Sequence, residues 1–124
     1  MRLRILLLSL ALLTFCCSSA IAKDGDIEVG GTCTGASSAK LKLSAEDGGI
    51  EVEFEVDQNR TGVRWDATLK RNGAPVVSAR PTTRGPSGSF ELRRVLVDGP
   101  AAEVINARAV SPSGEICRAR ATFP

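Results

Sequence analysis

The chain has 124 residues, with 16 lysines and arginines against 14 aspartates and glutamates, and it contains no histidine. A formal net charge of +2 is too small to indicate a nucleic acid or an anionic membrane as partner. Without histidine, the chain lacks the commonest general base and a usual zinc ligand. The length fits one small domain.

Residues 1–22 have the pattern of an export signal. A basic start at Arg2 and Arg4 is followed by an apolar run that ends at Cys17. This run is shorter than the roughly 20 residues that span a bilayer, and small residues precede Lys23 as a signal peptidase requires. We therefore expect cleavage before Lys23, a secreted or extracellular protein, and no membrane insertion after the signal is removed.

A lipid anchor on Cys16 is the less favoured alternative. Lipoprotein signals carry a small residue before the cysteine, and Phe15 is bulky. Loss of residues 1–22 also removes two arginines, which leaves 14 basic residues against 14 acidic ones. The mature chain is therefore formally neutral. We assign residues 23–31 to a flexible N-terminal segment and residues 32–124 to one β domain.

Two cysteines remain after the signal, Cys33 and Cys117. In the oxidising compartment that an exported chain reaches, one disulfide is the most economical use of such a pair. A bridge that closes so long a loop stabilises a fold by about 4.5 kcal/mol on the chain-entropy model. The alternatives are a redox pair or two metal thiolates, and the absence of both a C-x-x-C motif and histidine disfavours them.

A hairpin is predicted from residues 39–45 to residues 50–57. Apolar residues alternate with charged ones in both segments, and the intervening Asp47-Gly48 favours a type I′ turn. The register set by this turn pairs Lys42 with Glu53 and Lys40 with Glu55.

Every second residue from Glu51 to Asp57 is acidic. Carboxylates on one face of a strand stand about 7 Å apart and diverge, whereas calcium needs six or more oxygens that converge. We therefore interpret these acids as the solvated side of a strand. The sequence predicts no metal, no cofactor and no catalytic residue, since G-x-S-x-G and a free thiol are also absent.

The middle of the chain continues the two-residue alternation. Residues 63–70 form a third predicted strand with Trp65 inward, and Asn72-Gly73 turns the chain into a short strand at residues 75–79. A long connection rich in proline and glycine follows. The next strand, residues 89–97, cannot keep strict alternation without burying Arg94, so we expect a bulge or a twist there.

The last hairpin joins two strands through the turn Pro112-Ser113-Gly114. This turn pairs Ala109 with Cys117 and places Arg108 directly opposite Arg118. Like charges opposed across a ladder are unfavourable and call for compensation by Asp66, by an anion or by a partner.

A basic outward face follows from this register. Its expected members are Arg64, Lys70, Arg108, Arg118 and Arg120. The functional interpretation is a binding face for a cell-surface polymer or an acidic protein surface. The simpler interpretation is that these side chains spread into solvent over Asp66 and Glu115, as exposed charges usually do. Nucleic acid is disfavoured because the few aromatic residues are needed in the core.

Two stretches carry a resemblance to known domains. "EVINARAVSPSGEICRARATF", residues 103–123, resembles the last two strands of a fibronectin type III or immunoglobulin-like domain, and "VRWDATLKRNG", residues 63–73, resembles the tryptophan-bearing third strand of immunoglobulin-like domains. The usual tyrosine of type III domains would fall at Glu103. The overall plan is similar to that of small secreted actinobacterial proteins, a likeness that implies no activity.

These observations together predict an all-β fold, a seven-stranded antiparallel immunoglobulin-like sandwich with one disulfide. The expected role is a binding or adhesion module at the cell surface or outside the cell, and not an enzyme. The alternative is a structural or accessory envelope protein without a small-molecule site.

Overall fold

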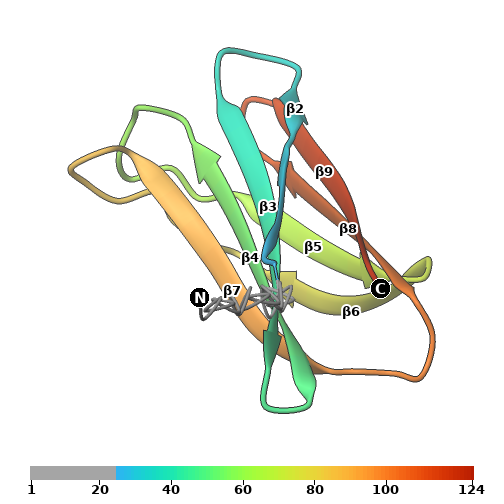
Figure 1. The fold of residues 1–124 in the computed structure, drawn as a ribbon. Helices are drawn as coiled ribbons and strands as arrows, with labels where there is room; N and C mark the ends of the chain where they lie inside the picture. Colours follow the sequence, from blue (N-terminus) through green and yellow to red (C-terminus); the bar gives the residue numbers. More distant parts are fainter. Residues whose placement is uncertain (1–24) are drawn as a thin grey trace, which may run out of the picture.

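Two antiparallel sheets pack face to face in the computed structural model, which describes residues 25–124 (Figure 1). The first sheet has the order β1-β3-β4-β7 and the second has the order β2-β9-β8-β5-β6. The strands are β1 (Ile27–Gly30), β2 (Thr32–Cys33), β3 (Ser38–Glu46), β4 (Gly49–Asp57), β5 (Asp66–Arg71), β6 (Ala74–Ala79), β7 (Ser89–Val97), β8 (Glu103–Val110) and β9 (Ile116–Phe123). The predicted signal peptide, residues 1–22, lies outside the described residues.

The hairpin of β3 and β4 has the predicted register, because its turn leaves little choice. Asp47 and Gly48 both have positive φ, 39° and 77°, as a type I′ turn requires. Lys42 lies opposite Glu53, and Lys40 lies opposite Glu55. Both pairings are thus confirmed.

The C-terminal hairpin is confirmed in the same way. Gly114 has a φ of 91° and the backbone N–H of Ser111 donates to the carbonyl of Glu115 at 2.9 Å, which closes the turn between β8 and β9. Arg108 consequently lies opposite Arg118. The predicted disulfide is also present, between Cys33 of β2 and Cys117 of β9, which face each other across the ladder.

Residues 25–124 form nine strands, whereas the sequence predicted seven. The two additional strands are β1, which pairs with β3, and β2, which pairs with β9. Between them the chain passes from one sheet to the other at Gly31, where a Cβ would lie 2.6 Å from the carbonyl oxygen of Arg118. The range 23–31, expected to be a flexible segment, therefore contains four residues that belong to a sheet.

Of the bulge or twist predicted at Arg94, the bulge is absent. β7 pairs with β4 along its whole length without a register shift, and Arg94 lies opposite Val52 on the inner side. Because β7 is an edge strand, the Arg94 side chain reaches solvent, where its guanidinium donates to the carbonyl of Arg93 at 2.7 Å. A register shift does occur in β5, between Leu69 and Lys70.

The core between the sheets is built from alternate residues of the central strands. Trp65, which precedes β5, is fully buried and lies against Phe90, with ring centroids 6.0 Å apart. Its Nε1 donates to Gln58 Oε1 at 3.1 Å, so the indole N–H is satisfied. The other members of the core include Leu41, Leu43, Ile50, Val52, Phe54, Val56, Leu69 and Ile105.

One ion pair lies on the inner side, near the end of the sandwich. Arg71 of β5 donates through Nε to Glu103 Oε1 at 2.9 Å, and its Nη2 contacts the same oxygen and the carbonyl of Val97 in β7. Glu103 is only 5% exposed. Arg71 therefore pairs with a buried carboxylate of its own sheet and contacts the other sheet through the Val97 carbonyl. Glu103 stands where the resemblance to type III domains predicted a tyrosine.

Candidate anion-binding groove

The outer face of the first sheet, here called the paired face, carries the row of acids on β4. Arg93 donates to Glu51 Oε2 at 2.7 Å, while Lys42 lies 3.9 Å from Glu53 and Lys40 lies 3.9 Å from Glu55. Glu51, Glu53 and Glu55 thus each have a cation on a neighbouring strand. The acids lie along one face of a strand, as the sequence predicted, but Glu51 is only 7% exposed.

Proton affinities on the paired face follow these contacts. The hydrogen bond from Arg93, with those from Glu46 and Glu53, lowers the pKa of Glu51 to about 2. Sharing a hydrogen bond with the Glu51 carboxylate raises the pKa of Glu46 and of Glu53. Farther along the sheet, hydrogen bonds from Ser44 and then Lys42 lower the pKa of Asp26.

Residues 25–124 contain no group of three Cys, Asp or Glu side chains that could hold a metal ion.

Ser37 and Lys40 form a formal S-x-x-K pattern, but the structure does not bring the serine hydroxyl and the lysine ammonium together. The Ser37 hydroxyl donates to Glu115 Oε1 at 2.5 Å, and Lys40 pairs with Glu55. Within this part of the chain there is also no helix long and apolar enough to cross a membrane.

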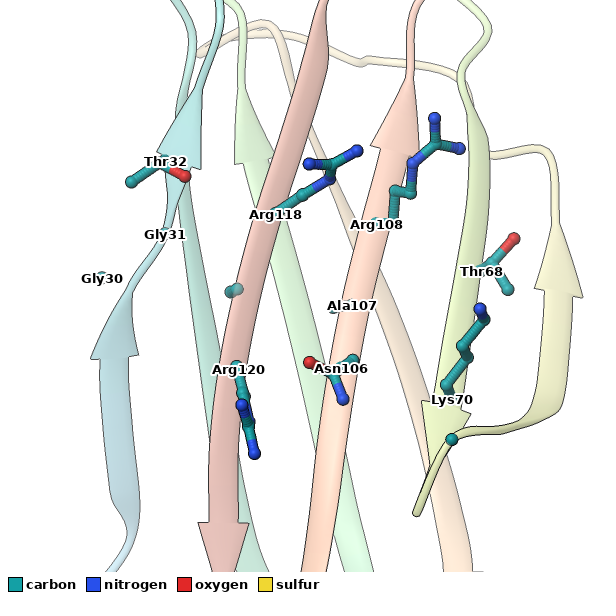
Figure 2. A pocket seen from close by; sticks show the side chains of 12 residues that line it. Gly30, Gly31, Thr32, Thr68, Lys70, Asn106, Ala107, Arg108, Arg118 and Arg120 are labelled. Atoms are coloured by element: carbon teal, nitrogen blue, oxygen red, sulfur yellow. The ribbon is translucent and has the colours of Figure 1, made fainter.

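The outer face of the second sheet differs, because it is hollowed into a groove of about 880 Å³, here called the basic groove (Figure 2). Its floor is formed by β8 and β9, and its sides by β5 and by the segment from β1 to β2. The residues that line it are Gly30, Gly31, Thr32, Thr68, Lys70, Gly73, Asn106, Ala107, Arg108, Arg118, Ala119 and Arg120. None of them is acidic or aromatic.

Strand pairing arranges the polar side chains of the groove in two transverse rows. The first row runs across four strands and consists of Thr32, Arg118, Arg108 and Thr68. The second runs across three strands and consists of Arg120, Asn106 and Lys70. Neighbouring strands lie about 4.8 Å apart, and residues two apart on a strand lie about 6.6 Å apart. Four cations therefore share a patch roughly 7 by 10 Å across.

The side chains follow this grid in Figure 2. The guanidinium groups of Arg118 and Arg108 lie at one end of the groove, and Lys70 extends along β5 toward Thr68. Arg120 points toward the other end. The groove thus offers one close pair of arginines and a third arginine farther along the same strand.

Neither of the expected compensating acids reaches the groove. Asp66 Oδ1 lies 3.1 Å from Arg80 Nε, and Glu115 accepts hydrogen bonds from the backbone and hydroxyl of Ser37. Among residues 25–124, none of the ion pairs includes any of the four groove cations, Lys70, Arg108, Arg118 and Arg120. The opposed arginines are therefore not neutralised by this part of the chain.

The structure brings together four of the five cations that the sequence singled out. Arg64 is not among the lining residues, since it lies before β5 in a bridge to Thr82. The sequence interpretation missed Asn106 and the side formed by Gly30, Gly31 and Thr32. Asn106 alternates with Arg108 along β8 and could have been found from the register, whereas the glycine side depends on long-range pairing.

Comparison of the chain with protein-family models, with curated protein sequences and with solved structures finds no significant match in any of the three. These comparisons identify neither a family nor a homologue. The structure itself shows a two-sheet antiparallel β-sandwich with one disulfide.

Proposed function

We propose that the protein is a secreted binding module that holds an anionic partner at the cell surface or outside the cell. The observation that carries this proposal is the basic groove, which is lined by four cations and by no acidic residue. None of these cations forms an ion pair within residues 25–124. A low-dielectric concave wall focuses the field of such charges and concentrates anions. Arginine adds specificity, because its planar fork matches carboxylate, sulfate and phosphate groups.

We also propose that the sandwich is of the fibronectin type III kind within the immunoglobulin-like folds. Leaving β1 and β2 aside, three strands in the order β3-β4-β7 face four strands in the order β6-β5-β8-β9. This arrangement supports the resemblance, although Glu103 stands where a tyrosine is usual. On this view the N-terminal strands are an addition that builds one side of the groove.

Binding to immobilised dextran sulfate tests the function. The double variant Arg108→Gln/Arg118→Gln removes two groove cations, and we expect its affinity to fall about tenfold or more at 150 mM salt. The matched control, Arg60→Gln/Arg84→Gln, removes the same charge from exposed loop positions outside the groove and leaves binding nearly unchanged.

Equal losses in the two double variants would mean that net charge alone governs retention, and the groove would not be the site. No binding by the unaltered protein to dextran sulfate or to intact cells would favour the alternative, a structural or accessory envelope protein. Thermal unfolding of each variant shows whether the fold is kept.

A further inference from the structure

The basic groove has a pattern of charged and neutral side chains that restricts the class of its partner. In the first row, a threonine flanks the arginine pair on either side, Thr32 beyond Arg118 and Thr68 beyond Arg108. In the second row, Asn106 separates Arg120 from Lys70. Hydroxyl or amide groups therefore lie beside the cations in both rows.

From this pattern we infer that the partner is an acidic polysaccharide, a linear polymer that carries hydroxyl groups together with carboxylate or sulfate groups. This inference rests on the proposed function and names its substrate class. An anionic group of the polymer binds between Arg108 and Arg118, where it neutralises two like charges at once. Its hydroxyl groups exchange hydrogen bonds with Thr68, Thr32 and Asn106.

The length of the groove indicates a polymer and not a single small anion. Arg120 lies two residues from Arg118 on β9, about 6.6 Å along the strand, and Figure 2 shows it pointing away from the arginine pair. One compact anion between Arg108 and Arg118 leaves Arg120 without a counter-charge. A chain with repeated anionic groups occupies both positions, and the volume of about 880 Å³ accommodates a short stretch of it.

The other anionic macromolecules fit the groove less well. Nucleic acids in single-stranded form are held by aromatic side chains on which bases stack, and the lining has none. Protein interfaces are anchored by buried aromatic or methionine side chains in a largely apolar centre. The only lining side chains without a polar group are those of Ala107 and Ala119, both of which are buried.

Gly30 forms part of one side of the groove, and the fold does not require glycine at this position. Gly30 has no left-handed φ, and a Cβ built on it meets nothing within 4 Å. A side chain therefore fits the backbone at this position, which is one of those that line the groove. Gly25 also meets nothing within 4 Å and does not line the groove, so it provides a matched position for comparison.

Calorimetric titration with three probes of similar charge tests the inference. The probes are a chondroitin-sulfate-type octasaccharide, which has one carboxylate and one sulfate per disaccharide, linear polyphosphate of eight phosphates and an octamer of glutamate. We expect the octasaccharide to bind at least fivefold more tightly than either of the others. The variant Thr32→Val/Thr68→Val keeps shape and charge but removes two hydroxyl groups, and it should weaken octasaccharide binding about tenfold and change polyphosphate binding less than twofold.

Gly30→Glu should lower the affinity for all three probes, whereas Gly25→Glu, with the same charge change, should not. Tightest binding of polyphosphate, or no effect of Thr32→Val/Thr68→Val, would overturn the polysaccharide assignment and leave the anion-binding function in place. Tightest binding of the glutamate octamer would replace it with an acidic protein segment. Binding of none of the probes would count against the proposed function itself, and against this inference with it.

Discussion

The two outer faces of the sandwich use similar residues in opposite ways. On the paired face, strand register places each cation beside an acid, as with Arg93 and Glu51, 2.7 Å apart. On the groove face, the same kind of register places Arg108 beside Arg118. The formal net charge of the whole chain is only +2, so the net charge conceals this separation. A face with matched charges needs no partner for its stability, whereas a face with opposed like charges favours an external anion.

A third group of charges, the ion pair of Arg71 and Glu103, lies inside the sandwich and extends the comparison. Substitution of this pair should have the largest effect on stability. Arg71→Ala leaves the buried carboxylate of Glu103 without its cation and removes the contact with the Val97 carbonyl. We expect the free energy of unfolding in urea to fall by about 3 kcal/mol. The control Arg120→Ala removes an exposed groove arginine and should change it by less than about 0.5 kcal/mol.

A second substitution separates loss of the pair from burial of a lone charge. Arg71→Met/Glu103→Leu replaces both partners by apolar side chains and should recover most of the stability lost in Arg71→Ala. If both variants were equally unstable, packing of the arginine stem and not the buried carboxylate would explain the loss.

A fall in pH should weaken the charge pairs of the paired face before it affects the groove. A carboxyl group whose pKa is lower in the folded than in the unfolded chain adds stability above its unfolded pKa, about 4.3 for glutamate. For Glu51 this stability is lost as the pH falls from about 4 toward its folded pKa of about 2. The raised pKa values of Glu46 and Glu53 have the opposite sign, because protonated forms favoured by folding add stability at low pH, and they offset part of the loss.

Melting temperatures measured from pH 7 to pH 2 check this sign. We expect the native protein to lose stability most steeply between pH 4 and pH 2, and Glu51→Gln to show a flatter profile over the same range. Glu91→Gln, a change at an exposed position of β7, serves as the control and should keep the native slope. An unchanged slope in Glu51→Gln would show that the contact with Arg93 does not persist in solution.

The smallest expected change in stability is a gain, and it comes from a substitution in the groove. Arg118→Glu places an acid opposite Arg108 and so gives the groove the charge pattern of the paired face. We expect a gain of about 0.2–1 kcal/mol in the free energy of unfolding, together with loss of binding to dextran sulfate. Urea denaturation and the binding assay on the same preparation measure both. A gain in stability with unchanged binding would mean that the arginine pair does not contact the partner.

The sequence predicted those parts of the molecule that local signals determine. Asp47-Gly48 and Gly114 form the turns of two hairpins, and each turn determines the register of the two strands that it joins. The opposed arginines followed from the second of these registers. Counting cysteines outside the predicted signal also sufficed to predict the disulfide, since only Cys33 and Cys117 remain.

What the sequence did not predict depends on residues far apart in the chain. β1 and β2 are short and separated by glycine, so their alternation is too brief to recognise, and only pairing with β3 and β9 makes them strands. The concave shape of the groove arises from that same pairing. The contact of Arg71 with Glu103 spans 32 residues and lies on the inner side, where alternation predicts apolar side chains.

The passage of the N-terminal segment from β1 to β2 has a consequence for self-association. It places a short strand on one border of each sheet, and the described part of the chain leaves β6 and β7 as the opposite borders. Pro75 interrupts the hydrogen-bonding edge of β6, and adjacent arginines at positions 93 and 94 give β7 charge on both sides. Exposed borders of this kind resist the addition of further strands. Within residues 25–124, the two uncovered borders therefore have features that disfavour the pairing of a further strand, although Val95 and Val97 of β7 are exposed.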